Sequence, residues 1–293
     1  MDDVPYDFID RVFTKLTFSS NYQFNDSLCV QSPLWTEVER VYKKKVESYS
    51  VNIVLSNDGG IFYEILPSHP TFEKLTAADD RFIRITGLTI CPAHPISATY
   101  HNRITNQLEF IRYLCRFELE DLDIRKATAE NQEIAIMLEE CVRLHVRNRV
   151  QIPSLTLSYT PALRDLLKHC LNSPTLQSLT LCQSGESTPS DFKDGIVAFV
   201  CRPNFRLLCC YFACLDMDCV RQIIAYWRSM EAPWKLASIT LLTMKQKEDL
   251  KSEIASMFSP TNKPDKYEEI IGNFRLDVHC IWPMTKLTFT VIS

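Results

Sequence analysis

Residues 152–181 read IPSLTLSYTPALRDLLKHCLNSPTLQSLTL and contain one apolar pattern twice. The first copy is residues 152–157 and the second is residues 176–181, and each has apolar residues at positions i, i+3 and i+5. Between the copies, from Leu163 to Cys170, apolar residues return at helical spacing. This arrangement predicts a strand, a helix and a second strand.

The same pattern recurs along most of the chain. Further copies occupy residues 85–90, 119–124, 207–212, 236–241 and 284–289. In a chain that is 46% apolar, three specified positions match at roughly one start in ten, so a single copy carries no weight. The segments between copies, however, repeatedly carry apolar residues at helical spacing. We therefore expect an α/β fold, a β-α solenoid resembling leucine-rich repeats with a curved parallel sheet. The alternative is an ordinary α/β domain with a closed sheet.

Composition excludes several classes of partner. The net charge of −4 and the pI near 5.9 do not favour nucleic acid or an anionic membrane surface. No apolar stretch is long enough to span a bilayer, and the acidic start Met1-Asp-Asp3 is unlike a signal peptide. The 12 cysteines are scattered and mostly replace apolar residues, as free thiols do in a reducing compartment. We expect a cytoplasmic or nuclear protein.

The first 45 residues have the pattern of a small helical module. Residues 4–16 carry a broad apolar helix face, and a second apolar run extends from Leu28 to Val41. A cluster of this size buries too little surface to be stable alone. It therefore needs either the downstream domain or a partner protein.

This module resembles an F-box. An aliphatic-Pro-any-acidic start is followed by a further aliphatic residue, a leucine and a later tryptophan, at Val4, Pro5, Asp7, Val12, Leu16 and Trp35. The whole chain is similar to nematode F-box-like proteins with a divergent repeat region. The resemblance implies that the module binds the Skp-type adaptor of a cullin-RING ubiquitin ligase. The implied adaptor-binding residues are Val4, Pro5, Ile9, Val12, Phe13, Leu16 and Trp35.

Residues 46–84 connect this module to the repeats. The alternating runs 51–55 and 61–65 flank an Asp-Gly-containing turn, which predicts a β-hairpin. A hairpin at this point would cap the open end of a solenoid. The expected domains are thus 1–45, an F-box-like module; 46–84, a hairpin cap or linker; and 85–293, a leucine-rich-repeat-like domain.

Motifs of an enzyme or a metal site are missing from the sequence. It has no phosphate-binding glycine loop, nucleophile elbow or His-Glu-x-x-His pair. The densest cysteine group, at 209, 210, 214 and 219, lacks the paired spacing of a zinc site, and adjacent strand residues point to opposite faces. The close pairs Cys91 with His94 and His279 with Cys280 lack an orienting third group. We expect no catalysis, no cofactor and no bound metal.

The alternation of the repeats predicts which residues form a binding surface. Positions i+2 and i+4 of each copy should point to the concave side of the sheet. The predicted target-binding residues are Asp121, Asp123, Thr156, Thr180, Tyr211 and Thr240. The resulting hypothesis is a non-catalytic substrate receptor that presents a target protein to a ubiquitin ligase. Its alternative is a repeat scaffold for protein–protein interaction with no ligase connection.

Overall fold

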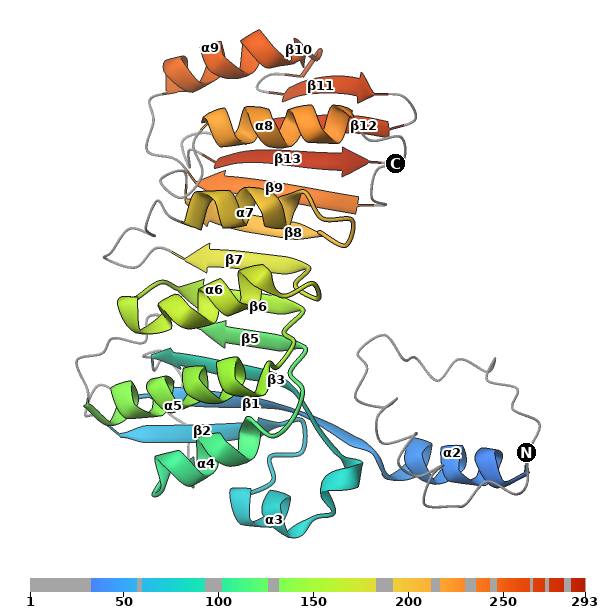
Figure 1. Cartoon of the computed structure of the whole chain (residues 1–293), viewed down its shortest axis with the longest axis vertical. Coiled ribbons are helices and arrows are strands. Elements are labelled where there is room, and N and C mark those ends of the chain that lie inside the picture. Colours follow the sequence, from blue (N-terminus) through green and yellow to red (C-terminus); the bar gives the residue numbers. More distant parts are fainter. Residues whose placement is uncertain are drawn as a thin grey trace.

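The chain has an α/β fold built on one large sheet (Figure 1). This computed structural model describes residues 33–56, 60–92, 102–125, 132–182, 192–211, 217–229, 236–242, 247–263, 266–271, 274–281 and 286–292. The 13 strands of the sheet are β1 (Glu47–Leu55), β2 (Ile61–Leu66), β3 (Ile83–Pro92), β4 (Asn102–Arg103), β5 (Asp121–Ile124), β6 (Ser154–Ser158), β7 (Ser178–Cys182), β8 (Leu207–Tyr211), β9 (Leu236–Leu242), β10 (Ser259–Pro260), β11 (Lys266–Ile271), β12 (Phe274–Ile281) and β13 (Lys286–Ile292).

Most of the sheet is parallel. Its strand order is β10-β11-β12-β13-β9-β8-β7-β6-β5-β3-β1-β2-β4. The strands from β9 to β1 in this order are parallel to their neighbours. Antiparallel strands flank them on both sides, β2 and β4 at one end and β13 to β10 at the other. The two edge strands, β4 and β10, are each 2 residues long.

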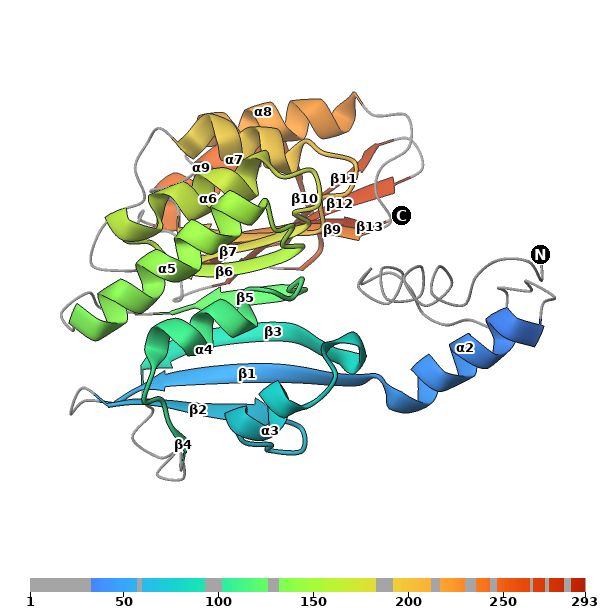
Figure 2. The same ribbon diagram turned by 60° about the horizontal axis from the view of Figure 1, so that its bottom comes forward.

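Helices connect the parallel strands. The α-helices in the described part of the chain are α2 (Pro33–Lys45), α3 (Phe72–Ala77), α4 (Gln107–Leu114), α5 (Gln132–Asn148), α6 (Arg164–Asn172), α7 (Lys193–Val200), α8 (Met217–Arg228) and α9 (Lys247–Met257). From α4 to α8, each helix lies between two successive parallel strands in the sequence, and each of these helices contacts its neighbour in the series. Figure 2 shows these helices side by side on one face of the sheet. Every connection therefore returns to the same face, and the opposite face carries no helix among the described elements.

The apolar pattern builds the core because it is in register from strand to strand. The i+3 positions lie side by side and are at most 1% exposed: Leu88, Leu122, Leu155, Leu179, Leu208 and Ile239. The i+5 positions, which include Ile124 and Leu157, form a second buried row two residues further on. Because alternate strand residues share a face, both rows point to the helices. The six predicted parallel segments between residues 85 and 241 are confirmed as strands of one sheet.

The copy predicted at residues 207–212 begins two residues earlier, although Cys210 is buried on the helix side as predicted. In β8 it is Leu208, not Cys210, that pairs with the i+3 residue Leu179, so this copy begins at Phe205. Phe205 is buried, whereas Leu207 is 36% exposed on the opposite face. Because this stretch is apolar almost throughout, the pattern fits from either Phe205 or Leu207. Both starts place Cys210 on the helix side, and the pairing register with β7 selects the first. The i+2 and i+4 positions of this copy were expected at Cys209 and Tyr211. In the structure they are Leu207 and Cys209.

The last predicted copy is also corrected. Residues 284–289 overlap β13, which runs antiparallel to β9 and pairs Leu287 with Leu241. The chain after α9 adds the antiparallel strands β10 to β13 rather than another β-α unit. Positions i+3 and i+5 are two residues apart and share one face of any strand, whether it is parallel or antiparallel. The pattern therefore does not predict the direction of a strand.

Two separate apolar clusters hold the described residues together. The larger one runs from Tyr49 in β1 to Val278 in β12. It includes the hairpin, since β1 and β2 pair antiparallel as predicted, and β1 continues the parallel sheet beside β3. The smaller one consists of Val38 and Tyr42 with Trp35, Val46 and Phe82 packed against them. Among the described residues, helix α2 is thus packed against Phe82, which directly precedes β3. No described helix has both the length and the apolar character that crossing a membrane requires.

Candidate functional site

The face of the sheet opposite the helices carries two rows of small and polar residues. The first, here called the polar row, places in register Thr89, Asp123, Thr156, Thr180, Cys209 and Thr240. A second row lies two residues earlier and contains Gly87, Asp121, Ser154, Ser178, Leu207 and Ser238. Strand alternation alone explains this segregation, because the same strands direct their leucines to the helices. The two rows form a continuous surface across six strands.

The predicted target-binding residues differ in how accessible they are. Thr156, Thr180 and Asp121 are half-buried, while Asp123 and Thr240 retain only 7% and 8% of their surface. The main chain of Tyr211 lies beyond the polar row, where it pairs with Leu242. Thr156, Thr180 and Asp121 are therefore the predicted residues most accessible to a partner. The sheet brings five of the six predicted residues into the two rows.

An ion pair lies on this surface at β5, the strand next to β3. Arg125 Nε donates to Asp123 Oδ1 at 2.9 Å, and Arg125 Nη2 lies 2.6 Å from Oδ2, so the guanidinium binds both carboxylate oxygens. Burial raises the pKa of the Asp123 carboxyl, although the ion pair acts in the opposite direction. Burial also raises the pKa of the nearby thiols of Cys91 and Cys182. Both thiols are therefore protonated at neutral pH and are weak nucleophiles.

The predicted adaptor-binding residues fall mainly outside the described part of the chain. Val4, Pro5, Ile9, Val12, Phe13 and Leu16 belong to residues 1–32, which the structure does not describe. Trp35 lies in the first turns of α2 and is half-buried beside Val38 and Tyr42. The ring of Tyr42 packs on Phe82 with 5.3 Å between centroids. Trp35 thus belongs to the small cluster that anchors α2.

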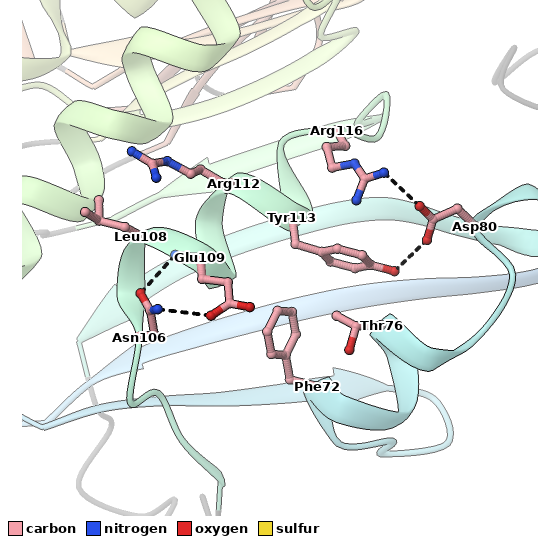
Figure 3. A pocket seen from close by; sticks show the side chains of 9 residues that line it. All are labelled: Phe72, Thr76, Asp80, Asn106, Leu108, Glu109, Arg112, Tyr113 and Arg116. Atoms are coloured by element: carbon pink, nitrogen blue, oxygen red, sulfur yellow. Dashed lines mark hydrogen bonds and ion pairs between the residues drawn. The ribbon is translucent and has the colours of Figure 1, made fainter.

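A cavity of about 770 Å³ lies between α3 and α4 (Figure 3). Its wall includes Phe72, Tyr113 and two arginines, and both arginines already have carboxylate partners. Asp80 accepts a hydrogen bond from the Tyr113 hydroxyl at 3.1 Å and lies 3.0 Å from Arg116 Nη2. Arg112 turns to Glu140, with 2.7 Å between Nε and Oε1. Such a balanced lining selects no particular class of ligand.

Within the described residues, one group of side chains could hold a metal ion. It consists of Cys115, Cys141 and His145, all buried between α4 and α5. The sequence places Cys141 and His145 one turn apart on the same helix face, a spacing that by itself is typical of the buried stripe of a helix. Among the described residues, Cys209, Cys210 and Cys219 belong to no such group, and Cys214 lies outside the described part of the chain. Cys209 and Cys210 point to opposite faces of β8, and Cys219 belongs to α8.

Comparison with known proteins adds no relative. No family model, curated protein or solved structure matches this chain.

Proposed function

We propose that the chain is a non-catalytic substrate receptor of a Skp-cullin-F-box ubiquitin ligase. The observation that carries this proposal is the spacing of Val4, Pro5, Asp7, Val12 and Leu16, which is typical of the start of an F-box. In such a receptor, the N-terminal module binds the adaptor and the remaining domain binds a target protein. The many free thiols suit its action in the cytoplasm or nucleus.

The proposal includes a solenoid as the finer description of the fold. We propose that the units from β3 to β9 are divergent leucine-rich repeats, each formed by one strand and one helix. Three features support it: the parallel strands follow one another in chain order, the helices α4 to α8 share one face, and the leucines are in register. Repeats of this kind bind partners through the sheet surface.

The polar row is the proposed target surface. Its hydroxyl groups can donate and accept hydrogen bonds, and its threonines keep the strands stable in the absence of a partner. Helix α2 lies between the proposed adaptor-binding segment and the sheet, and its own apolar cluster fixes it to Phe82. A fixed connection of this kind suits a receptor that must hold its target at a set distance from the ligase.

The alternative is a scaffold that recruits no ligase. The packing of α2 on Phe82 favours it to some extent, because a helix anchored to the sheet can serve the fold alone. The two functions differ in what the apolar face of residues 4–16 contacts, either a partner protein or this chain.

An affinity capture from cells tests the proposal. The double variant Val12→Asp/Phe13→Asp should lose the adaptor and the cullin, since unpaired carboxylates would be desolvated in the interface. The matched control is Thr14→Asp/Lys15→Asp, which adds the same carboxylates at the two following positions and should retain both partners. If Val12→Asp/Phe13→Asp is folded and captures as much adaptor as wild type, the adaptor does not bind through this face. Unfolding of the first variant but not of the control would favour the scaffold.

A second variant pair separates target binding from adaptor binding. Thr156→Arg/Thr180→Arg places two bulky cations in the middle of the polar row and should release the target while the adaptor stays bound. Gln222→Arg/Ala225→Arg adds the same charge on the exposed face of α8 and is the control. Quantitative mass spectrometry of the captured proteins measures both. If both variants retain the same set of proteins as wild type, the polar row is not the target surface.

A further inference from the structure

A compact group of soft donor atoms lies in the core between two neighbouring helices. Cys115 follows α4 directly as its C-terminal cap residue, and Cys141 and His145 lie one turn apart on α5. All three are buried, with exposed fractions of 3%, 0% and 0%. The potential ligand atoms lie within 4.8 Å of one another. Thiolate sulfur and imidazole nitrogen are the donors that zinc prefers in proteins.

The separations between these atoms fit a tetrahedral metal centre. His145 Nδ1 lies 3.7 Å from the sulfur of Cys115 and 3.5 Å from that of Cys141. Zinc binds sulfur at about 2.3 Å and imidazole nitrogen at about 2.0–2.1 Å, so a tetrahedral angle places the two donors about 3.6 Å apart. Both observed separations agree with this value to about 0.1 Å. Both nitrogen–sulfur separations are thus compatible with an ion bound by His145 and the two thiolates, and the two sulfur atoms lie within 4.8 Å of each other.

The hydrogen bonds of His145 leave the imidazole incompletely satisfied. Nδ1 lies 2.7 Å from the carbonyl oxygen of Cys141, whereas the buried Nε2 has no hydrogen-bond partner. Metal binding would transfer the ring proton to Nε2 and direct the Nδ1 lone pair at the ion. This exchange loses the hydrogen bond to the carbonyl oxygen and leaves the Nε2 proton without an acceptor among the described residues, and both costs are smaller than the free energy of zinc binding to thiolates.

Charge balance selects a divalent ion. On binding, the two thiols release their protons to solvent, and the resulting two thiolates neutralise a doubly charged cation beside a neutral imidazole. A monovalent copper ion would leave one net negative charge in a dry core, where uncompensated charge is costly. The fourth position can take a neutral ligand such as water without changing this balance. The neighbouring Glu140 is already paired with Arg112 and Arg143 and adds no uncompensated charge.

We propose that Cys115, Cys141 and His145 bind Zn²⁺ and that the ion joins the end of α4 to α5. The site is independent of the proposed ligase function, because it lies on the helix side of the sheet and includes none of the polar-row residues. Its consequence is structural: a bound ion makes the packing of these two helices depend on metal supply.

Titration of the full chain with Co²⁺ after chelator treatment tests the site, because cobalt replaces zinc and reports thiolate ligands by its visible absorption. One Co²⁺ per chain should give a thiolate charge-transfer band, and Zn²⁺ should displace it and raise the melting temperature in proportion to the logarithm of its concentration. Cys115→Ser and Cys141→Ser should weaken binding by at least about 10–100-fold, the loss that even outer partners of a metal site cause. Cys170→Ser is the control, because this thiol is equally buried but lies on α6.

The wild-type titration decides the question even if the serine variants do not fold. Absence of the charge-transfer band in folded wild-type protein would overturn the proposal. A band of equal strength in a folded Cys115→Ser/Cys141→Ser protein would assign it to other thiols and would overturn it as well. Peptide mapping that finds Cys115 disulfide-bonded to Cys141 in the chelator-free protein would also refute the zinc site.

Discussion

Replacing Leu179 by alanine tests the phase of the parallel strands. Leu179 is fully buried in β7, between Leu155 of β6 and Leu208 of β8. The substitution removes three carbon atoms from the core, and at about 0.8 kcal/mol for each this transfer alone costs about 2.4 kcal/mol. Incomplete collapse of the surrounding residues adds a cavity contribution, so the total should fall within about 2–5 kcal/mol.

The control for this prediction is Thr180→Val in the next position of the same strand. It keeps a β-branched side chain of the same shape but lies on the opposite face, so the free energy of unfolding should change by no more than about 0.5 kcal/mol. Urea unfolding followed by circular dichroism, with an unchanged dependence on urea, measures both variants. A loss below about 0.5 kcal/mol for Leu179→Ala, or equal losses for the two variants, would refute the assigned phase.

Three further predictions concern polar contacts. Arg143 and Arg112 hold the pKa of Glu140 at about 2, below its value in the unfolded chain. The ion pairs of Glu140 therefore stabilise the fold at neutral pH, and this stabilisation is lost as the pH falls from about 4.5 to about 2. Glu140→Gln should therefore cost about 1–2 kcal/mol at pH 7 and almost nothing near pH 2; a pH-independent difference in urea titrations would disprove this. Arg202 donates to the carbonyl oxygens of Leu171 and Ser173 at the end of α6, and Arg202→Met should cost about 1–3 kcal/mol in thermal unfolding, whereas an unchanged melting temperature would show the contacts to be dispensable. Asn106 accepts from the Glu109 N–H at 3.1 Å as the N-terminal cap of α4, so Asn106→Ala should cost about 1 kcal/mol and speed hydrogen exchange at Glu109; equal exchange rates would argue against the cap.

The parallel strands could be predicted from the sequence where leucines and polar residues alternate clearly. In β6 and β7, for example, Leu155 and Leu179 are flanked by Ser and Thr, so only one phase buries the apolar side chains. In β8 the run Leu207-Leu-Cys-Cys210 is apolar throughout and contains no such information. The direction of β13 also could not be read, because alternation is the same in parallel and antiparallel strands.

Of the two candidate sites, the sequence predicts the polar row but not the Cys115, Cys141 and His145 group. The polar row follows from alternation alone and was predicted residue by residue, with Tyr211 displaced by the shift in β8. The Cys115, Cys141 and His145 group depends on how α4 packs on α5, which spacing along one helix does not give. Only the Cys141 and His145 pair, four residues apart, was visible in the sequence.

The short edge strands determine how this sheet can associate with other chains. An exposed edge offers unpaired backbone groups to any passing strand, and long parallel sheets risk growing end to end into fibres. Here β10 offers only two residues, and Pro260 lacks the N–H that a further ladder would need. At the opposite end, β4 is equally short and carries the exposed cation of Arg103. Where β4 and β10 cover β2 and β11, these two strands therefore oppose the addition of a further strand from another chain.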